Sequence, residues 1–164
     1  MDEEFERMIR DAIGKPTGKI TDEDMASIRN LNIDQTTASA IGELRGLTNL
    51  ENLMIWENDI GDISALGKLA NLKKLGIMSD KVTDVGVLGE LATLVSLHVE
   101  IREGHSLDFL KGMTEMRQLL LKQRGLTDIS VLGGLRKLEE LRLTGASVTD
   151  FSPVAHVRNL RLYE

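Results

Sequence analysis

Residues 50–71 read LENLMIWENDIGDISALGKLAN, and residues 72–93 read LKKLGIMSDKVTDVGVLGELAT. Both segments have 22 residues and carry apolar residues at the same places. Extending the comparison in both directions gives seven apolar columns at a constant offset of 22, headed by Ile28, Leu31, Ile33, Ala38, Ile41, Leu44 and Leu47. Of the forty-two positions in these columns, only Gly104 is not apolar. A repeat period of roughly 20 to 50 residues is typical of a solenoid, so the chain is predicted to be one.

Each unit is predicted to begin with a β-strand. In residues 52–56, apolar Leu53 and Ile55 alternate with outward-facing residues, which is the two-residue period of a strand. Since every strand returns in the same orientation after a connection of fixed length, successive strands should be parallel neighbours in one sheet. We predict six full units over residues 28–159 and the start of a seventh over residues 160–164. Constant spacing places Leu160 in the column of Leu138 and turns Tyr163 toward the core.

Residues 1–27 precede the repeats and are predicted to form a helical cap. Their apolar residues fall at helical spacing and form one stripe, made of Phe5, Met8, Ile9, Ala12 and Ile13. Gly14 can end this helix, and Thr21 with Asp24 resembles a capping box that begins a second one. The stripe is expected to cover the open end of the first unit, and the whole chain then forms one continuous domain.

The pattern Leu-x-x-Leu-x-Ile-x-x-Asn-x-Ile-x-x-Ile-x-x-Leu of residues 50–66 resembles the leucine-rich repeat of bacterial, internalin-like proteins. The resemblance covers residues 28–164, and residues 5–25 are similar to the helical N-terminal cap of that family. It implies an α/β repeat solenoid, a right-handed superhelix with a parallel concave β-sheet and short 3-10 or extended convex turns. It also implies a bacterial origin and binding to other proteins.

Two polar columns follow the strands. The family places an asparagine in the turn after each strand, but the column reads Thr36, Asn58, Asp80, Arg102, Arg124 and Ala146, which indicates a looser ladder or plain repeat decay. The second column holds Asp62, Asp84, Ser106, Asp128 and Asp150. These side chains suit the start of a short helical turn, where they accept backbone N–H bonds. A calcium site is the alternative, but one carboxylate per level cannot surround an ion that needs six to eight oxygens.

The composition argues against several classes of function. The chain has 164 residues, a formal charge of −6 and no cysteine, which excludes a disulfide scaffold and cysteine-based metal sites. An acidic chain is not drawn to phosphate backbones, so we expect no nucleic-acid partner. No segment approaches the ~20 apolar residues of a membrane span, and the acidic first five residues differ from the basic start of a signal peptide. We expect a cytoplasmic protein, or a secreted or surface protein whose export signal is absent from the chain.

The candidate site lies on the concave face of the sheet. The only tryptophan, Trp56, falls in an outward strand column together with Met54 and Met78, and an exposed patch of this kind is typical of protein interfaces. A polar rim is predicted around it, made of Glu57, His98, Glu100, Leu120, Lys122 and Arg142. The alternative is that strands simply favour aromatic residues and that a flanking loop covers the ring.

These residues favour recognition over catalysis. His98 and Glu100 share a face, but an open sheet supplies neither a third ligand nor a pocket that excludes water. No phosphate-binding loop and no Gly-x-Ser-x-Gly motif is present, so no enzymatic activity, cofactor or metal is expected. We therefore predict a module that binds a partner protein on its concave face. The alternative is a structural unit that forms a weak homodimer through the strand at its C-terminal edge.

Overall fold

The computed structural model describes residues 1, 3–34, 38–56 and 60–164, and for residues 38–40 it describes the backbone only. The described elements, in chain order, are α1 (Glu3–Ile13), α2 (Asp22–Ser27), β1 (Asn30–Asp34), α3 (Ala38–Glu43), η1 (Leu44–Gly46), β2 (Asn52–Trp56), η2 (Ser64–Lys68), β3 (Lys74–Ile77), η3 (Gly86–Glu90), β4 (Ser96–Glu100), η4 (Asp108–Gly112), β5 (Gln118–Lys122), η5 (Ser130–Gly134), β6 (Glu140–Thr144), η6 (Ser152–Val154) and β7 (Asn159–Tyr163). The label η marks a 3-10 helix.

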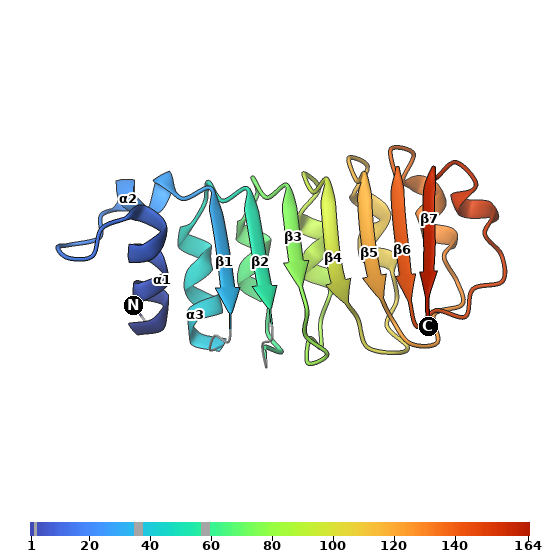
Figure 1. Ribbon diagram of the computed structural model, residues 1–164, viewed down its shortest axis with the longest axis horizontal. Coiled ribbons are helices and arrows are strands. Elements are labelled where there is room, and N and C mark those ends of the chain that lie inside the picture. The colour runs from blue at the N-terminus through green and yellow to red at the C-terminus, as the bar shows by residue number, and fades with distance from the viewer. Residues whose placement is uncertain (2, 35–37, 57–59) are drawn as a thin grey trace.

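The seven described strands form one parallel sheet in chain order, and the helical turns lie behind it (Figure 1). From β1 to β6 the pairing follows the 22-residue offset, so that Leu31 pairs with Leu53 and Leu53 with Leu75. The two layers and the parallel order confirm the predicted α/β solenoid, with 3-10 turns on the side opposite the sheet.

The core fills the space between the sheet and the 3-10 helices. Leu53 and Ile55 point inward from β2, Leu66 points inward from η2, and none of the three exposes any surface. A fully buried side chain of this type contributes about 1.5–3 kcal/mol. Since the same columns recur in every unit, the leucine layers stack into one continuous core.

The acidic column accepts backbone bonds at the start of the 3-10 helices, as predicted, but from the residue that precedes each N-cap. Each of these side chains accepts the backbone N–H of the residue two positions later at 2.8 to 3.1 Å, at Asp62, Asp84, Ser106, Asp128 and Asp150. The backbone N–H of Ser64 lowers the pKa of the Asp62 carboxyl, because the bond favours the charged form. The carboxylates of this column therefore stabilise the turns.

The N-terminal helices form as predicted. Phe5 and Ile9 of α1 are fully buried, and the helix ends at Ile13, directly before Gly14, whose φ of 65° few other residues adopt readily. At α2 the Thr21 Oγ1 accepts from the Asp24 N–H, and the Asp24 carboxylate accepts from the Thr21 N–H. Among the described residues, no helix is long and apolar enough to cross a bilayer.

The last strand departs from the predicted spacing. Leu160 pairs with Leu141 and Tyr163 with Thr144, an offset of 19, so the predicted alignment of Leu160 with Leu138 is wrong. Three successive hydrogen-bonded turns precede β6, closed by the N–H groups of Leu132, Leu135 and Leu138, whereas the corresponding series before β7 has two, closed by Val154 and Val157. The final unit thus lacks one three-residue turn. Tyr163 consequently faces away from the core and is 49% exposed.

Candidate functional site

The open face is the side of the sheet that points away from the 3-10 helices, and it carries the side chains between the inward leucines. Strand pairing aligns one column across it, consisting of Met54, Gly76, His98, Leu120, Arg142 and Arg161. A second column consists of Glu100, Lys122, Thr144 and Tyr163, in line with Trp56 on β2 and with Met78 directly after β3. The structure therefore brings eight of the nine predicted site residues onto one face. The ninth, Glu57, lies outside the described residues.

Trp56 and His98 meet across an intervening strand. Their ring centroids are 5.8 Å apart and the ring planes are inclined by 74°, an edge-to-face arrangement. Trp56 lies on β2 and His98 on β4, and the strand between them contributes Gly76. A Cβ atom on Gly76 would lie 2.6 Å from the Met54 Sδ and 3.9 Å from the Trp56 Cη2. The missing side chain on β3 thus leaves room for Met54 and for the ring contact.

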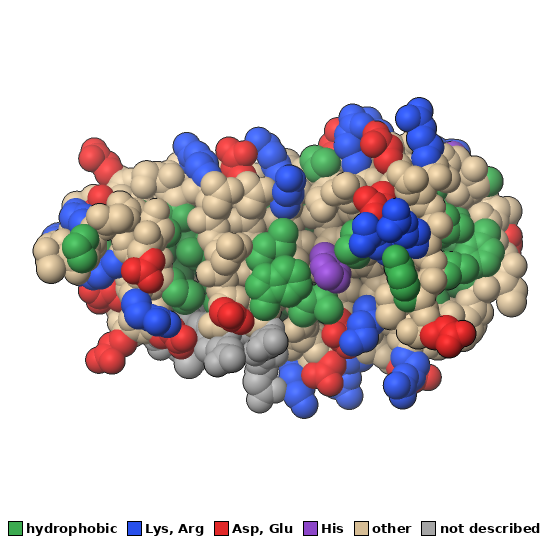
Figure 2. Space-filling model, in the orientation of Figure 1, with side chains coloured by type: hydrophobic (Ala, Val, Ile, Leu, Met, Phe, Trp, Pro, Cys, Tyr) green, Lys and Arg blue, Asp and Glu red, His purple; other side chains and the backbone are tan. Residues whose placement is uncertain are grey.

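The apolar residues of this face are partly buried rather than exposed, which corrects the prediction. Met54, Trp56 and Met78 are each of intermediate exposure. Met54 lies in the space above Gly76, beside the Trp56 ring that contacts His98, so neighbouring side chains cover part of the patch. Figure 2 shows the hydrophobic side chains gathered at the middle of the open face, next to a histidine.

A hollow of about 250 Å³ lies beside this patch, toward β7. Its lining residues come from β4 to β7 and the end of β3, namely Met78, His98, Leu120, Leu121, Lys122, Arg142, Thr144 and Tyr163. The predicted site did not include three of these residues, Leu121, Thr144 and Tyr163. The alternating Leu160 and Leu162 carried the signal for Tyr163, because their two-residue period matches that of Leu141 and Leu143.

Two ion pairs between charged side chains lie on the open face. The Lys122 Nζ lies 2.7 Å from the Glu100 Oε1, and the Arg142 guanidinium lies 2.7 Å from the Glu140 carboxylate. Local pairing leaves the face without a strong excess of either charge, in keeping with the sequence. These pairs border the hollow, so a ligand bound there would meet an apolar floor and a polar rim.

The surroundings of His98 favour its neutral form. Burial lowers its pKa, the positive charge of Arg142 lowers it further, and Glu100 acts in the opposite direction. The Glu100 carboxylate is already engaged by Lys122. No cluster of three His, Asp or Glu residues suited to a metal ion occurs in the described ranges. The geometry accordingly favours an aromatic contact for His98 over a metal or acid–base role.

The parallel sheet, the stacked 3-10 turns and the helical N-terminus together define the fold of a leucine-rich-repeat solenoid. No protein-family model matches the sequence, and no curated protein matches it significantly. Among solved structures, internalin C2 of Listeria monocytogenes is 21% identical with a TM-score of 0.65, over 99% of this chain and 93% of that one.

Two further structures extend the comparison. InlP of Listeria monocytogenes is 14% identical with a TM-score of 0.76, over 98% of this chain and 51% of that one. The plant peptide hormone receptor RGFR1, solved in complex with RGF2, is 15% identical with a TM-score of 0.57, over 82% of this chain and 23% of that one. At such identities the likeness concerns the fold, which this chain shares with proteins of bacteria and plants.

Proposed function

We propose that this chain is a non-enzymatic recognition module that binds a partner protein on the open face of its sheet. The observation that carries the proposal is the apolar patch of Met54, Trp56 and Met78, which continues through His98 and Leu120 into the hollow. These side chains have no part in the leucine layers of the core, because they lie on the opposite side of the strands. Interface hot spots are enriched in tryptophan, and Trp56 is the only one in the chain.

The scaffold favours binding at low entropic cost. The strands of the open face belong to one hydrogen-bonded sheet, and the leucine layers behind it are fully buried. A preformed surface loses little conformational freedom when a partner docks, so more of the contact energy remains as affinity.

The hollow sets the chemistry of the partner. Met78 and Leu120 give it an apolar floor, whereas Lys122, Arg142 and Tyr163 line its rim. We expect the partner to insert one aliphatic or aromatic side chain here and to place polar groups against the rim. The charge pairs of the face give no general attraction for a nucleic acid, so a protein remains the proposed partner.

The structural relatives are consistent with this proposal. Internalins share the fold, and the plant receptor RGFR1 was solved with RGF2 bound. A protein of similar fold is thus a peptide hormone receptor solved with RGF2 bound, which supports a polypeptide partner for this chain.

The test compares the wild type with a Met54→Ala, Trp56→Ala, Met78→Ala triple variant whose fold is checked by circular dichroism. A protein captured by the wild type is identified and purified, and its affinity is measured by calorimetry. Loss of a hot spot of about 2 kcal/mol lowers affinity roughly thirtyfold, and we expect at least this for the triple variant. An unchanged affinity would show that the partner binds elsewhere.

The matched control is the variant Glu115→Ala, Lys137→Ala. These two exposed residues form an ion pair of 2.6 Å outside the strands of the open face. We expect this variant to keep the full affinity. An equal loss in the control and in the triple variant would argue for a general effect on the fold.

The second candidate is self-association through β7. Its apolar residues Leu160, Leu162 and Tyr163 are exposed by 38%, 54% and 49%, and among the described strands β7 pairs with β6 alone. An edge strand of this kind can pair with a second copy. Light scattering over a concentration series tests it, since a chain that stays monomeric at several hundred micromolar is no self-assembling unit.

A further inference from the structure

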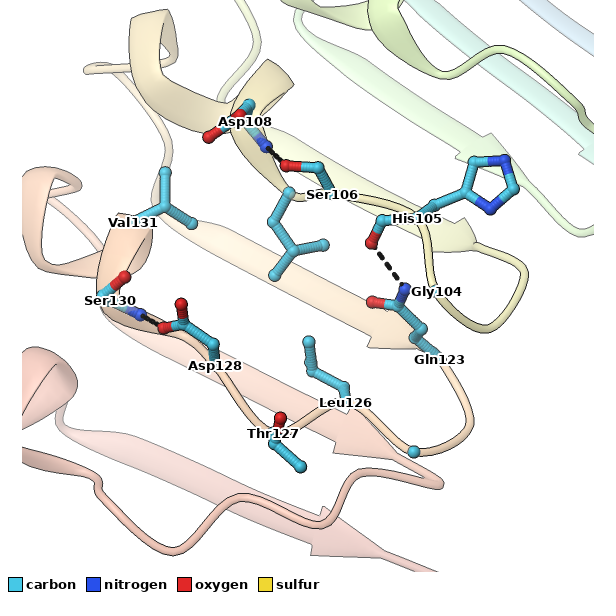
Figure 3. A pocket seen from close by; sticks show the side chains of 12 residues that line it. Gly104, His105, Ser106, Asp108, Gln123, Leu126, Thr127, Asp128, Ser130 and Val131 are labelled. Carbon is cyan, nitrogen blue, oxygen red and sulfur yellow. Dashed lines mark hydrogen bonds between the residues drawn. The ribbon is translucent and has the colours of Figure 1, made fainter.

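A second pocket, away from the open face, coincides with the one break in the apolar columns. Val82 and Leu126 occupy the column of Gly104 in the preceding and the following unit, and both are buried. At Gly104 an added Cβ would meet no atom within 4 Å. A pocket of about 300 Å³ lies here between the loops that follow β4 and β5, and Gly104 is part of its wall (Figure 3).

Gln123 forms the inner wall of this pocket. Its Nε2 donates to the backbone oxygens of Arg102 at 3.1 Å and His105 at 2.8 Å. Ser79 lies in the same column two units earlier, and its hydroxyl likewise donates to the backbone oxygen of Ile60 at 3.0 Å. These side chains supply the turn bonds expected of the asparagine column, one residue earlier than predicted.

The other end of the Gln123 amide is unsatisfied. Two carbonyl acceptors fix the NH₂ group on one side, so Oε1 must lie on the other. Gln123 is only 3% exposed, and its Oε1 has no hydrogen-bond partner within the described structure. Figure 3 shows this oxygen turned toward the side of the pocket where Leu126 lies. A buried carbonyl without a donor is costly, and a ligand N–H would satisfy it.

The remaining walls also present acceptors. Asp128 lines the pocket, and no ion pair engages it among the described residues, whereas Asp108 is paired with Lys111 at 2.8 Å. The backbone N–H of Ser130 lowers the pKa of Asp128, so this carboxylate is charged at neutral pH. Leu107, Leu126 and Val131 add apolar surface.

We propose that this pocket, the Gly104 pocket, binds an alkylguanidinium group. The planar cation can donate in different directions to the Gln123 amide oxygen and to the Asp128 carboxylate, while its weakly hydrated faces pack against leucine. Because Oε1 exposes almost no area, a wall side chain must shift to admit the donor. Leu126, which is 8% exposed, is the one we expect to move. The group comes either from a free arginine-like molecule or from an arginine side chain of a polypeptide.

An NMR titration of the full chain with ethylguanidinium chloride tests the proposal. We expect saturable shifts of the Gly104 and Gly125 amides, the Gln123 side-chain NH₂ and the Leu126 methyls, with a dissociation constant on the order of millimolar. Neutral ethylurea should not saturate these signals. Equal binding of ethylurea, or no saturable shift up to about 50 mM guanidinium, which lies well above that constant, would overturn the proposal.

The variant Asp128→Asn removes the charge but keeps the oxygen that accepts from Ser130, so the turn should stay folded. Asp62→Asn is the matched control, because Asp62 makes the same 2.8 Å bond to Ser64 outside the pocket. We expect about tenfold weaker binding in the first variant and unchanged binding in the second. Equal affinity of both variants and the wild type would refute the role of Asp128 and with it the proposed site.

Two further probes distinguish the sources of the cation. Free L-arginine represents a small molecule, and N-acetyl-arginine methylamide represents a side chain of a polypeptide. Tighter binding of the blocked form supports the second source, and equal or tighter binding of the free form supports the first. A crystal structure grown with ethylguanidinium that shows only an ordered water on the Gln123 Oε1 would overturn the proposal for both.

Discussion

Replacing Gly76 with alanine should alter the open face while leaving the fold intact. The added Cβ would lie 2.6 Å from the Met54 Sδ, which is closer than real contacts allow, but 3.9 Å from the Trp56 ring, which is ordinary contact. Met54 is flexible and partly exposed, so its thioether can move aside. We expect Gly76→Ala to displace Met54 and to change the surroundings of Trp56.

Two effects on stability nearly cancel in this variant. Alanine in a strand interior is about 0.5–1 kcal/mol more favourable than glycine, because its unfolded chain has less freedom to lose. Moving Met54 away from its preferred rotamer costs about 0.5–1.5 kcal/mol. The free energy of unfolding should therefore stay within about 1 kcal/mol of the wild-type value.

The assay combines urea unfolding, followed by far-ultraviolet circular dichroism, with two local probes. Since Trp56 is the only tryptophan, its emission spectrum reports on the patch alone, and the methyl resonance of Met54 reports the displaced side chain. Gly134→Ala is the control, because nothing lies within 4 Å of the added Cβ there. The control should leave both local probes unchanged.

The reasoning fails under either of two results. A loss of more than about 2 kcal/mol in Gly76→Ala would mean that Met54 cannot move without disturbing the core. Unchanged Trp56 emission and an unchanged Met54 methyl resonance would mean that Met54 does not lie over Gly76 at all.

Three further predictions concern the cap and the titratable groups. Phe5→Ala removes a fully buried ring and should cost about 3–5 kcal/mol in urea unfolding, with hydrogen-exchange protection lost in β1 before β6. The hydrogen bond from Lys15, followed by that from the Thr21 backbone, lowers the pKa of Asp24 from 3.8 to about 2. The melting temperature should thus fall between about pH 4 and 2, and less so in Asp24→Asn, since the unfolded state binds the proton first. The pKa of His98 is lowered by burial, so the unfolded state again binds the proton more readily. Stability should fall as the pH drops below 6.5, and His98→Gln should lessen this fall in pH-dependent calorimetry.

Most of the fold was predictable because the core residues of a solenoid recur at a constant spacing in the sequence. The offset of 22 fixes which residues pair from β1 to β6, and the alternation within residues 52–56 fixes which of them face inward. The capping box of Thr21 and Asp24 was equally readable, since it depends on residues three apart. The constant spacing predicted the wrong partner for Leu160, because one three-residue turn is absent before β7. A comparison at a fixed offset of 22 does not detect such a deletion.

The candidate site was predictable as a surface but not as a geometry. The outward columns placed Met54, Trp56 and His98 on one face. The contact of Trp56 with His98, however, depends on Gly76, which lies on the strand between them. The partial burial of the patch of Met54, Trp56 and Met78 depends on side-chain rotamers, which the sequence pattern does not specify. The hollow near Tyr163 depends on the register of β7. It could not be predicted, because the fixed offset of 22 gave the wrong register for that strand.

Departures from the repeat are the most informative positions in this chain. A residue that agrees with its column is explained by the core, whereas one that departs from it weakens the layer and needs another reason. Gly104 is such a departure from an inward column, and Gly76 is the one position without a side chain in its outward column. At Gly76 the missing side chain makes room for Met54 beside the contact of Trp56 with His98, and at Gly104 it leaves a pocket with an unsatisfied amide in its wall. A larger side chain would continue the apolar column at Gly104 and would displace Met54 at Gly76, so both features depend on a missing side chain.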